Sequence, residues 1–330
     1  MLKKLLRTDS GRVRLPRRFR RQAMLAIVCT ALLSCAAAQA MDLPQPHQVS
    51  KHAWAWIGPY GPPTAENRGF RMNLGFVAGD DAVAVIDSGY GDAMAEAMRK
   101  QISAITDRPI RYVINTNSQP HRTLGNAAFR EAGAETIAAA DAVPRMRDQG
   151  PELAATAAGI LGVSANQVRA PGEPDRALAS ETELDLGGVK LRIVPVGAAH
   201  TAGSLVVEVV GDDLVFAGDV LYGGRLLSLL SVSRTDGWID AFDRLRAFGD
   251  VRFVPGHGEP APLADFEQLN YRYLELLKTH MDAAVDEGLG LQEAIDSLDQ
   301  SAWNSLADFD LLSGRNAHRA YLEREMAAFD

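Results

Sequence analysis

Cysteine is almost absent from this chain. Only two of its 330 residues are cysteine, Cys29 and Cys35, and both fall within the first 40 residues. The rest of the chain therefore has no thiol that could form a disulfide or bind a metal ion. Any metal ion there must be held by histidine, aspartate, glutamate or backbone oxygen atoms.

Acidic residues are scarce at the N-terminus, where nine Lys and Arg residues of segment 1–40 oppose only Asp9. An apolar run, Ala23–Leu33, follows these basic residues, and the segment ends in Ala38-Gln39-Ala40. A basic leader, a short apolar run and an Ala-x-Ala end predict a secretory signal peptide over residues 1–40. We therefore expect a periplasmic or secreted protein.

Two alternatives to cleavage of this segment stay open. The apolar run is short for a membrane span, but an uncleaved N-terminus would anchor the chain in the membrane. Lipidation at Cys35, after Leu32-Leu33-Ser34, would do the same. The pairs Arg17-Arg18 and Arg20-Arg21 hint at a twin-arginine export signal.

Positive charge is scarce in the rest of the chain. The whole sequence has a formal net charge of −8, and residues 1–40 contribute a net +8, so residues 41–330 have a net charge of about −16. Such an acidic chain is a poor binder of nucleic acid. The composition, 47% hydrophobic and 23% charged, is that of a globular protein, and we expect residues 41–330 to form one domain with C-terminal helices.

Two blocks of predicted strands flank a helical, Ala-rich stretch at 140–162. The periodicity predicts strands over 50–57, 71–78, 82–87, 111–115 and 135–139, and then over 181–186, 189–195, 204–210, 213–217 and 252–255. Helices are predicted over 92–105, 127–132, 237–248, 263–287, 291–298 and 317–329. Strand blocks that each carry their own helices favour two sheets packed face to face, with helices outside.

Four stretches place polar side chains at predicted strand ends. The first is the turn in Val113–Asn126, which reads VINTNSQPHRTLGN. His200, Asp219 and His257 each follow a strand, next to a glycine-containing turn. Because such turns can converge on one sheet edge, they predict a common site.

These stretches resemble the metallo-β-lactamase fold superfamily, whose metal-binding turn reads His-x-His-x-Asp-His after a strand ending in Asn-Thr. The resemblance spans residues 72–258 in family order. It implies a mixed α/β fold, the four-layer αββα sandwich, in which two zinc ions activate a bridging water for hydrolysis. The flanks Glu66–Gly69, Thr106–Pro109 and Gly125–Phe129 most resemble exported zinc hydrolases linked to quinoprotein dehydrogenases. That likeness implies a small-molecule substrate and a quinoprotein partner.

The ligand positions of that turn hold other residues here. Aligning Asn115-Thr116 and Gly125-Asn126 with the family leaves Asn117, Gln119, His121 and Arg122 in the four positions. Amide side chains are poor ligands for zinc. The resemblance implies that two histidines of this turn and the residue matching His200 bind the first metal ion. Of these ligands, only His200 would therefore remain.

The second metal site keeps more of its ligands. The resemblance leaves it His121, Asp219 and His257, a recognised two-His, one-carboxylate set. It also implies that Asp87 supports the site from behind the ligands. Position alone places Tyr222 and Arg225 at the mouth of the pocket.

Arg122 decides between three hypotheses for this site. A guanidinium has no lone pair for a metal ion and repels it, but it can form a bidentate pair with Asp219. The chain is then metal-free. Alternatively, one Zn, Fe or Mn ion binds His121, Asp219 and His257 with help from His200, or a two-metal site remains.

Two functions follow from these hypotheses. The first is a periplasmic hydrolase-like protein with an eroded metal site, which slowly hydrolyses ester, thioester or lactone-like bonds with a single metal ion. No general base is evident, because the Asp of the family motif is missing. The second is a non-catalytic, metal-free relative that binds a small molecule or a partner protein such as a quinoprotein. Loops 59–71 and 140–176 are expected to shape the pocket.

Overall fold

The computed structural model describes residues 41–329. The predicted signal peptide and the alternatives to it fall on residues 1–40, outside the described residues, and stay predictions. Among the described helices, none is both long and apolar enough to cross a membrane.

The first sheet has seven strands, in the order in which they occur along the chain. They are β1 (His47–Gln48), β2 (Ala53–Trp56), β3 (Leu74–Ala78), β4 (Val83–Ile86), β5 (Ile110–Ile114), β6 (Glu135–Ala139) and β7 (Arg176–Leu178). Pairing is antiparallel from β1 to β4 and parallel from β4 to β7.

The second sheet has six strands in the order β13-β12-β11-β10-β9-β8. Their bounds are β8 (Thr182–Asp185), β9 (Lys190–Gly197), β10 (Ser204–Val209), β11 (Leu214–Tyr222), β12 (Arg252–His257) and β13 (Ala261–Pro262). Only β11 and β12 pair in parallel. The hairpin of β8 and β9 turns at Gly187 and Gly188, which both have positive φ, as the Gly-Gly pair predicts.

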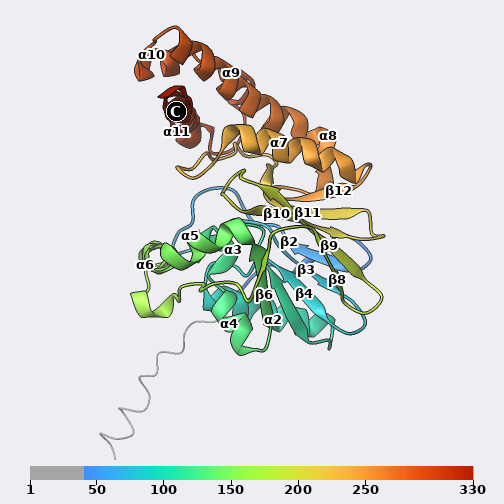
Figure 1. Cartoon of the computed structure of the whole chain (residues 1–330). Helices are drawn as coiled ribbons and strands as arrows, with labels where there is room; N and C mark the ends of the chain where they lie inside the picture. Colours follow the sequence, from blue (N-terminus) through green and yellow to red (C-terminus); the bar gives the residue numbers. More distant parts are fainter. Residues whose placement is uncertain (1–40, 330) are drawn as a thin grey trace, which may run out of the picture. The chain divides into compact units, whose positions relative to one another are not determined.

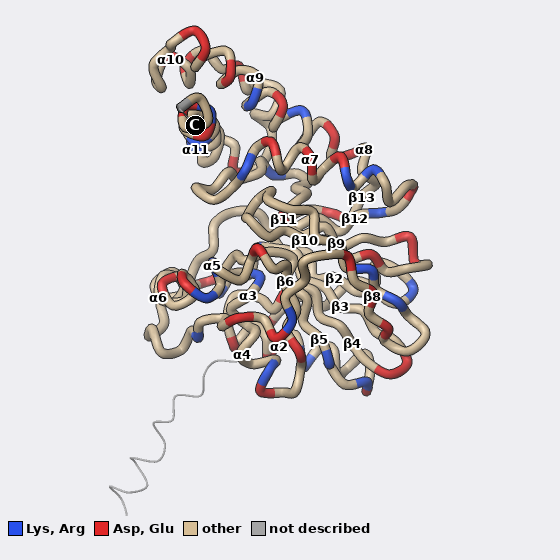
Figure 2. Tube along the Cα trace, in the orientation of Figure 1, with Lys and Arg blue, Asp and Glu red and all other residues tan. Residues whose placement is uncertain are grey.

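Helices cover the outer faces of both sheets (Figure 1). Helices α2 (Asp92–Ile105) and α4 (Asn126–Glu131) lie against the first sheet, and α7 (Thr235–Leu245) and α8 (Leu263–Phe266) lie against the second. Helix α9 (Arg272–Asp286) packs against α7 and extends away from the sheet. The remaining helices are α3 (Pro120–Thr123), α5 (Val143–Asp148), α6 (Gly150–Leu161), α10 (Leu291–Asp296) and α11 (Phe309–Phe329). This confirms the predicted αββα sandwich. Charged residues concentrate on the helices and loops (Figure 2).

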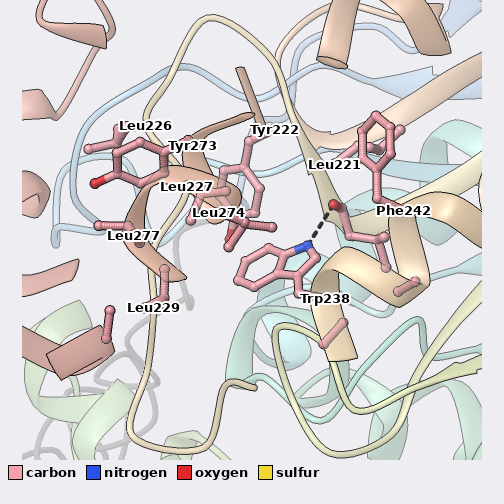
Figure 3. Packing of buried hydrophobic residues seen from close by; sticks show 14 of the residues in the cluster. Leu221, Tyr222, Leu226, Leu227, Leu229, Trp238, Phe242, Tyr273, Leu274 and Leu277 are labelled. Atoms are coloured by element: carbon pink, nitrogen blue, oxygen red, sulfur yellow. Dashed lines mark hydrogen bonds between the residues drawn. The ribbon is translucent and has the colours of Figure 1, made fainter. Parts of the chain in front are cut away.

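Separate apolar clusters fill the three spaces between the four layers. Between the sheets, Phe216 packs so close to Gly75 that a Cβ on Gly75 would lie 2.3 Å from the Phe216 ring. On the outer side of the second sheet, α7 and α9 bury aromatic and leucine side chains against it (Figure 3). Trp238 of α7 is fully buried there, and its Nε1–H donates to the Val220 carbonyl at 2.9 Å. This bond ties the helix layer to β11.

Several predicted elements differ from the structure in their bounds or their regularity. Strand β2 begins at Ala53 rather than at residue 50, and α11 begins at Phe309 rather than at residue 317. The helix predicted over 263–287 contains a π-helical turn, Glu267–Tyr271. Within that turn the Asn270 side chain accepts a hydrogen bond from the Tyr222 N–H and donates one to the Tyr222 carbonyl. The amide thus pairs with the end of β11, a tertiary contact that periodicity does not reveal.

Candidate functional site

Five buried residues from both sheets meet at one edge of the sandwich. Asp87 directly follows β4, Arg122 lies in α3, and His200 follows β9. Asp219 lies in β11, and His257 is the last residue of β12. The predicted convergence of these stretches is therefore present.

The sequence predicts Asp219 at the end of a strand, but the structure places it inside one. It lies inside β11, which continues to Tyr222, after an irregularity in its pairing with β12 between Phe216 and Gly218. Gly218 has a φ of 51°, and a Cβ there would lie 2.3 Å from Thr116 Oγ1. A bulge of this kind can redirect a side chain within a strand, and only glycine permits the close approach to the turn after β5.

The Arg122 guanidinium uses all five of its N–H groups inside the protein. Nε and Nη2 donate to Asp219 Oδ2 and Oδ1 at 3.0 and 2.6 Å. Nη1 donates to Asp87 Oδ2 at 3.0 Å and to the Asn73 carbonyl at 2.6 Å. Nη2 also donates to the Gly256 carbonyl at 3.1 Å. The side chain is fully buried, so the bidentate pair expected from the sequence forms in the interior.

Asp219 has four close polar contacts. Besides Arg122, it accepts from Asn117 Nδ2 at 2.8 Å and faces His121 Nε2 at 3.1 Å, both through Oδ2. Three of these four contacts fall on Oδ2 and one on Oδ1, and His257 Nε2 lies 3.4 Å from Oδ1. Burial acts to raise the pKa of Asp219, but Arg122 and His121 outweigh it and hold the pKa well below its usual range.

Asp87 lies on the far side of the guanidinium. It accepts from the Thr116 N–H at 2.7 Å and from Thr116 Oγ1 at 2.9 Å, in addition to Arg122. Burial nevertheless raises the pKa of Asp87 to about 6. Arg122 thus lies between two carboxylates that are both taken out of water. Burial acts to lower the pKa of Arg122, but Asp219 and Asp87 outweigh it, so the group stays charged.

Two asparagines hold the backbone of the turn. Asn115 Nδ2 donates to the Arg122 carbonyl at 2.7 Å, and Asn126 Nδ2 donates to Asn115 Oδ1 at 2.8 Å. These residues belong to the flanks that carry the family resemblance. Their role in this chain is to fix the peptide from which the guanidinium projects.

Three histidines surround the open side of Asp219. The Nε2 atoms of His121, His257 and His200 lie 3.1, 3.4 and 4.0 Å from its carboxylate oxygens. Burial lowers the pKa of His121 and of His200 to about 4 and lowers that of His257 well below its usual range. His257 Nδ1 lies 2.8 Å from the Arg71 carbonyl. A neutral imidazole that donates there has its Nε2 lone pair directed at Asp219.

The donor set does not fit the two-metal centre of the family. In the alignment expected from the sequence, Arg122 falls at the position of the last ligand of one ion, and Asn117 and Gln119 fall at the positions of two histidines of the other. A single ion fits better, since ligand atoms of His121, Asp219 and His257 lie within 4.8 Å of one another. To bind there, the ion would have to enter between His121 Nε2 and Asp219 Oδ2, which lie 3.1 Å apart.

A cavity of about 180 Å³ opens above this cluster. Its walls include the predicted mouth residues Tyr222 and Arg225, the ligand-position residues Gln119, His121, His200 and His257, and also Pro63, Arg71, Tyr90, Pro120, Ser228 and Leu230. Loop 59–71 shapes the cavity as predicted. The expectation for 140–176 is wrong, because within the described chain none of those residues lines it. Sequence reasoning missed Arg71, which no motif marks.

The comparisons with known proteins agree with this architecture. The model of the metallo-beta-lactamase superfamily matches residues 69–257, so the chain belongs to that superfamily. It is similar in fold to a metallo-beta-lactamase from Pontibacter korlensis, with 19% identity, 70% of this chain and 98% of that one covered, and a TM-score of 0.54. It is also similar to the metallo-beta-lactamase FIM-1 from Pseudomonas aeruginosa in its mono-zinc form. That match has 21% identity, covers 72% of this chain and 98% of the other, and has a TM-score of 0.55.

Proposed function

We propose that this chain is a metallo-β-lactamase-fold protein with an eroded metal site, in which the Arg122 guanidinium replaces a metal ion. Its function is then to bind a small molecule in the cavity rather than to hydrolyse it. The main support for this proposal is that all five N–H groups of Arg122 donate hydrogen bonds within the protein, two of them to Asp219.

Electrostatics favour this function over a two-ion centre. A dication about 4 Å from a guanidinium is repelled by roughly 8 kcal/mol at an effective dielectric constant of about 20. Each 1.4 kcal/mol is about a tenfold loss of affinity. The guanidinium cannot lose its proton to avoid the repulsion, because Asp219 and Asp87 raise its pKa.

A second candidate function has an observation of its own. The grouping of His121, Asp219 and His257 favours a hydrolase that uses one ion. A bound divalent ion would supply water of lowered pKa for hydrolysis of an ester, thioester or lactone-like bond. Within this chain, the Arg71 carbonyl would orient His257 through Nδ1. No carboxylate stands at the motif position of His121 to take a proton from the water.

The metal content of protein purified without chelators separates the two functions. The binding-protein proposal predicts far less than one equivalent of zinc, iron or manganese, and no ester, thioester or lactone hydrolysis above the rate of denatured protein. About one equivalent of metal that is lost in His257→Ala, together with hydrolysis, would establish the single-metal enzyme instead.

Restoring the family ligands gives a converse test. The triple change Asn117→His, Gln119→His and Arg122→His replaces the cation and both amides with metal ligands. Metal uptake should rise, whereas Arg122→Lys, which keeps the positive charge, should leave uptake unchanged. No increase in the triple variant would show that the guanidinium is not what excludes the ion.

We also propose that the chain is exported to the periplasm and that its partner there is a quinoprotein. The basic leader with its Ala-x-Ala end and the flanking motifs support this proposal. N-terminal sequencing of protein from the periplasmic fraction should begin at Met41. A mature chain that begins at Met1 in the cytosol would contradict export.

A further inference from the structure

Arg71 lies on the wall of the cavity, and its guanidinium has more N–H donors than hydrogen-bond acceptors around it. It lies just before β3, and its Nε and Nη2 atoms are buried but have no hydrogen-bond partner among residues 41–329. Its nearest carboxylate is Asp308, whose Oδ2 lies 3.8 Å from Nη2, too far for a hydrogen bond. Buried N–H groups of this kind cost free energy unless something accepts from them.

Asp308 is already committed to a second cation. Its carboxylate forms a short hydrogen bond with Arg225 Nε, and the Arg225 guanidinium also lies 5.7 Å from the centre of the Tyr222 ring. Two guanidinium groups therefore share one carboxylate on this wall. Deeper in the site, Asp87 and Asp219 are held by Arg122, so neither partners Arg71 by hydrogen bonding.

A second unpartnered donor lies on the same cavity. Gln119 is 9% exposed, and its Nε2 has no hydrogen-bond partner in the described chain. Its backbone N–H is used, because it donates to Asn117 Oδ1. The wall around these donors also includes less polar side chains, those of Pro63, Tyr90, Pro120 and Leu230. Two wall residues of the cavity thus hold unpartnered N–H groups just beneath its surface, and a ligand reaches them when these side chains turn toward it.

We propose that the cavity binds an organic oxyanion, a carboxylate or phosphate monoester with a small apolar body, through the Arg71 guanidinium and the Gln119 amide. A guanidinium and an amide NH₂ match the geometry of such oxygens. The inference rests on the proposed function in taking the cavity as a ligand site. It does not require that metal is absent.

Calorimetric titration with benzoate, phenyl phosphate and the neutral methyl benzoate tests this inference. The two anions should bind, each to one site, and the ester should bind at least about tenfold more weakly. Comparing benzoate with phenyl phosphate shows which oxyanion the site prefers. Binding of the ester as strongly as the acid, or no binding of either anion, would overturn the inference.

Two variants locate the site. Arg71→Gln should weaken anion binding about ten- to a hundredfold. It should still fold, because Arg71 Nε and Nη2 hold no partner and the carbonyl that meets His257 is retained. Gln119→Glu is nearly isosteric and should abolish binding by placing a negative charge beside the anion.

The matched control is Arg145→Gln on α5. Arg145 also has an unpartnered buried Nε, but it does not line the cavity. The control should bind the anions as the native chain does, and anion binding unaffected by Arg71→Gln would overturn the inference. Metal content measured on the same sample keeps the two proposals apart. Metal with retained anion binding refutes only the binding-protein function, whereas metal-free protein that binds neither anion refutes only this inference.

Discussion

Arg122 and Asp219 meet edge to edge across the two sheets, with Nε and Nη2 donating to the two carboxylate oxygens at 3.0 and 2.6 Å. One residue comes from the turn after β5 and the other from β11, so the pair joins the two sheets. Asn73 reinforces the same junction, since its side chain donates to the carbonyls of Pro255 and Gly258. An ion pair therefore holds the two sheets together at the candidate site.

Removing the charge of Arg122 should strongly destabilise the fold. Arg122→Met fills a similar volume but leaves Asp219 and Asp87 buried without their cation. Breaking a buried pair in this way costs roughly 3–5 kcal/mol of unfolding free energy, which urea unfolding at neutral pH measures. Arg99→Met is the control, because the Arg99–Glu96 pair is exposed and should cost at most about 1 kcal/mol. Equal effects of the two changes would mean that the buried pair contributes little.

Gly256 should not tolerate a side chain. A Cβ at this position would lie 2.4 Å from Asp219 Oδ1 and 2.7 Å from Arg122 Nη2. Gly256→Ala must therefore displace the ion pair or the backbone of β12, and we expect a loss of about 1–3 kcal/mol in unfolding free energy, measured by urea unfolding.

Gly159→Ala is the matched control for that change. Gly159 lies in α6, and beyond the backbone of that helix no atom comes within 4 Å of the place that a Cβ would take. Alanine should raise the unfolding free energy there by about 0.5–1 kcal/mol, because it loses less backbone entropy than glycine in a helix. If Gly256→Ala proved as harmless as Gly159→Ala, the site would be far more compliant than its contacts indicate.

The metal-free protein should lose stability as the pH falls from about 6.5 to about 4. The pKa values of His121 and His200 are lowered from 6.5 to about 4 by burial, so the folded state keeps both rings neutral. The stabilisation is present above pH 6.5 and is lost as the pH falls through the folded pKa. Each histidine accounts for roughly 3 kcal/mol at most.

Asp87 changes the unfolding free energy in the opposite direction over part of this pH range. Burial raises its pKa from 3.8 to about 6, so its contribution is largest below pH 3.8 and is lost as the pH rises through 6. This offsets about one histidine, whereas His257, whose pKa burial also lowers, adds to the loss, so the net fall on acidification is at least roughly 3–4 kcal/mol. Urea unfolding at several pH values measures the fall, and His200→Gln should reduce it by about 3 kcal/mol. A flat profile would show that these rings are charged or hydrated in the folded protein.

The sequence by itself determined the layers of this protein. Apolar runs such as Ala82–Asp87 and the helical spacing of Met94, Met98 and Ile102 are local patterns, and each recurs in the structure as a buried strand or helix face. The helix over 92–105 and the strand over 135–139 have the predicted bounds. Local patterns were enough to predict these elements, because a strand buried on both faces is apolar throughout and a helix buried on one face has apolar residues at helical spacing.

The sequence also placed Arg122 and Asp219 at one site, because their turns stand in family order. It suggested their bidentate pair, but it could not show the other contacts of the guanidinium. Besides Asp219, the guanidinium donates to Asp87 and to the carbonyls of Asn73 and Gly256. Every residue has a backbone carbonyl, so a sequence does not reveal which carbonyls accept these bonds. Nor could it find Arg71, whose unpartnered N–H groups follow from the shared use of Asp308 across the fold. Periodicity records which residues are buried, whereas the partner of each buried polar atom is fixed only when distant segments pack.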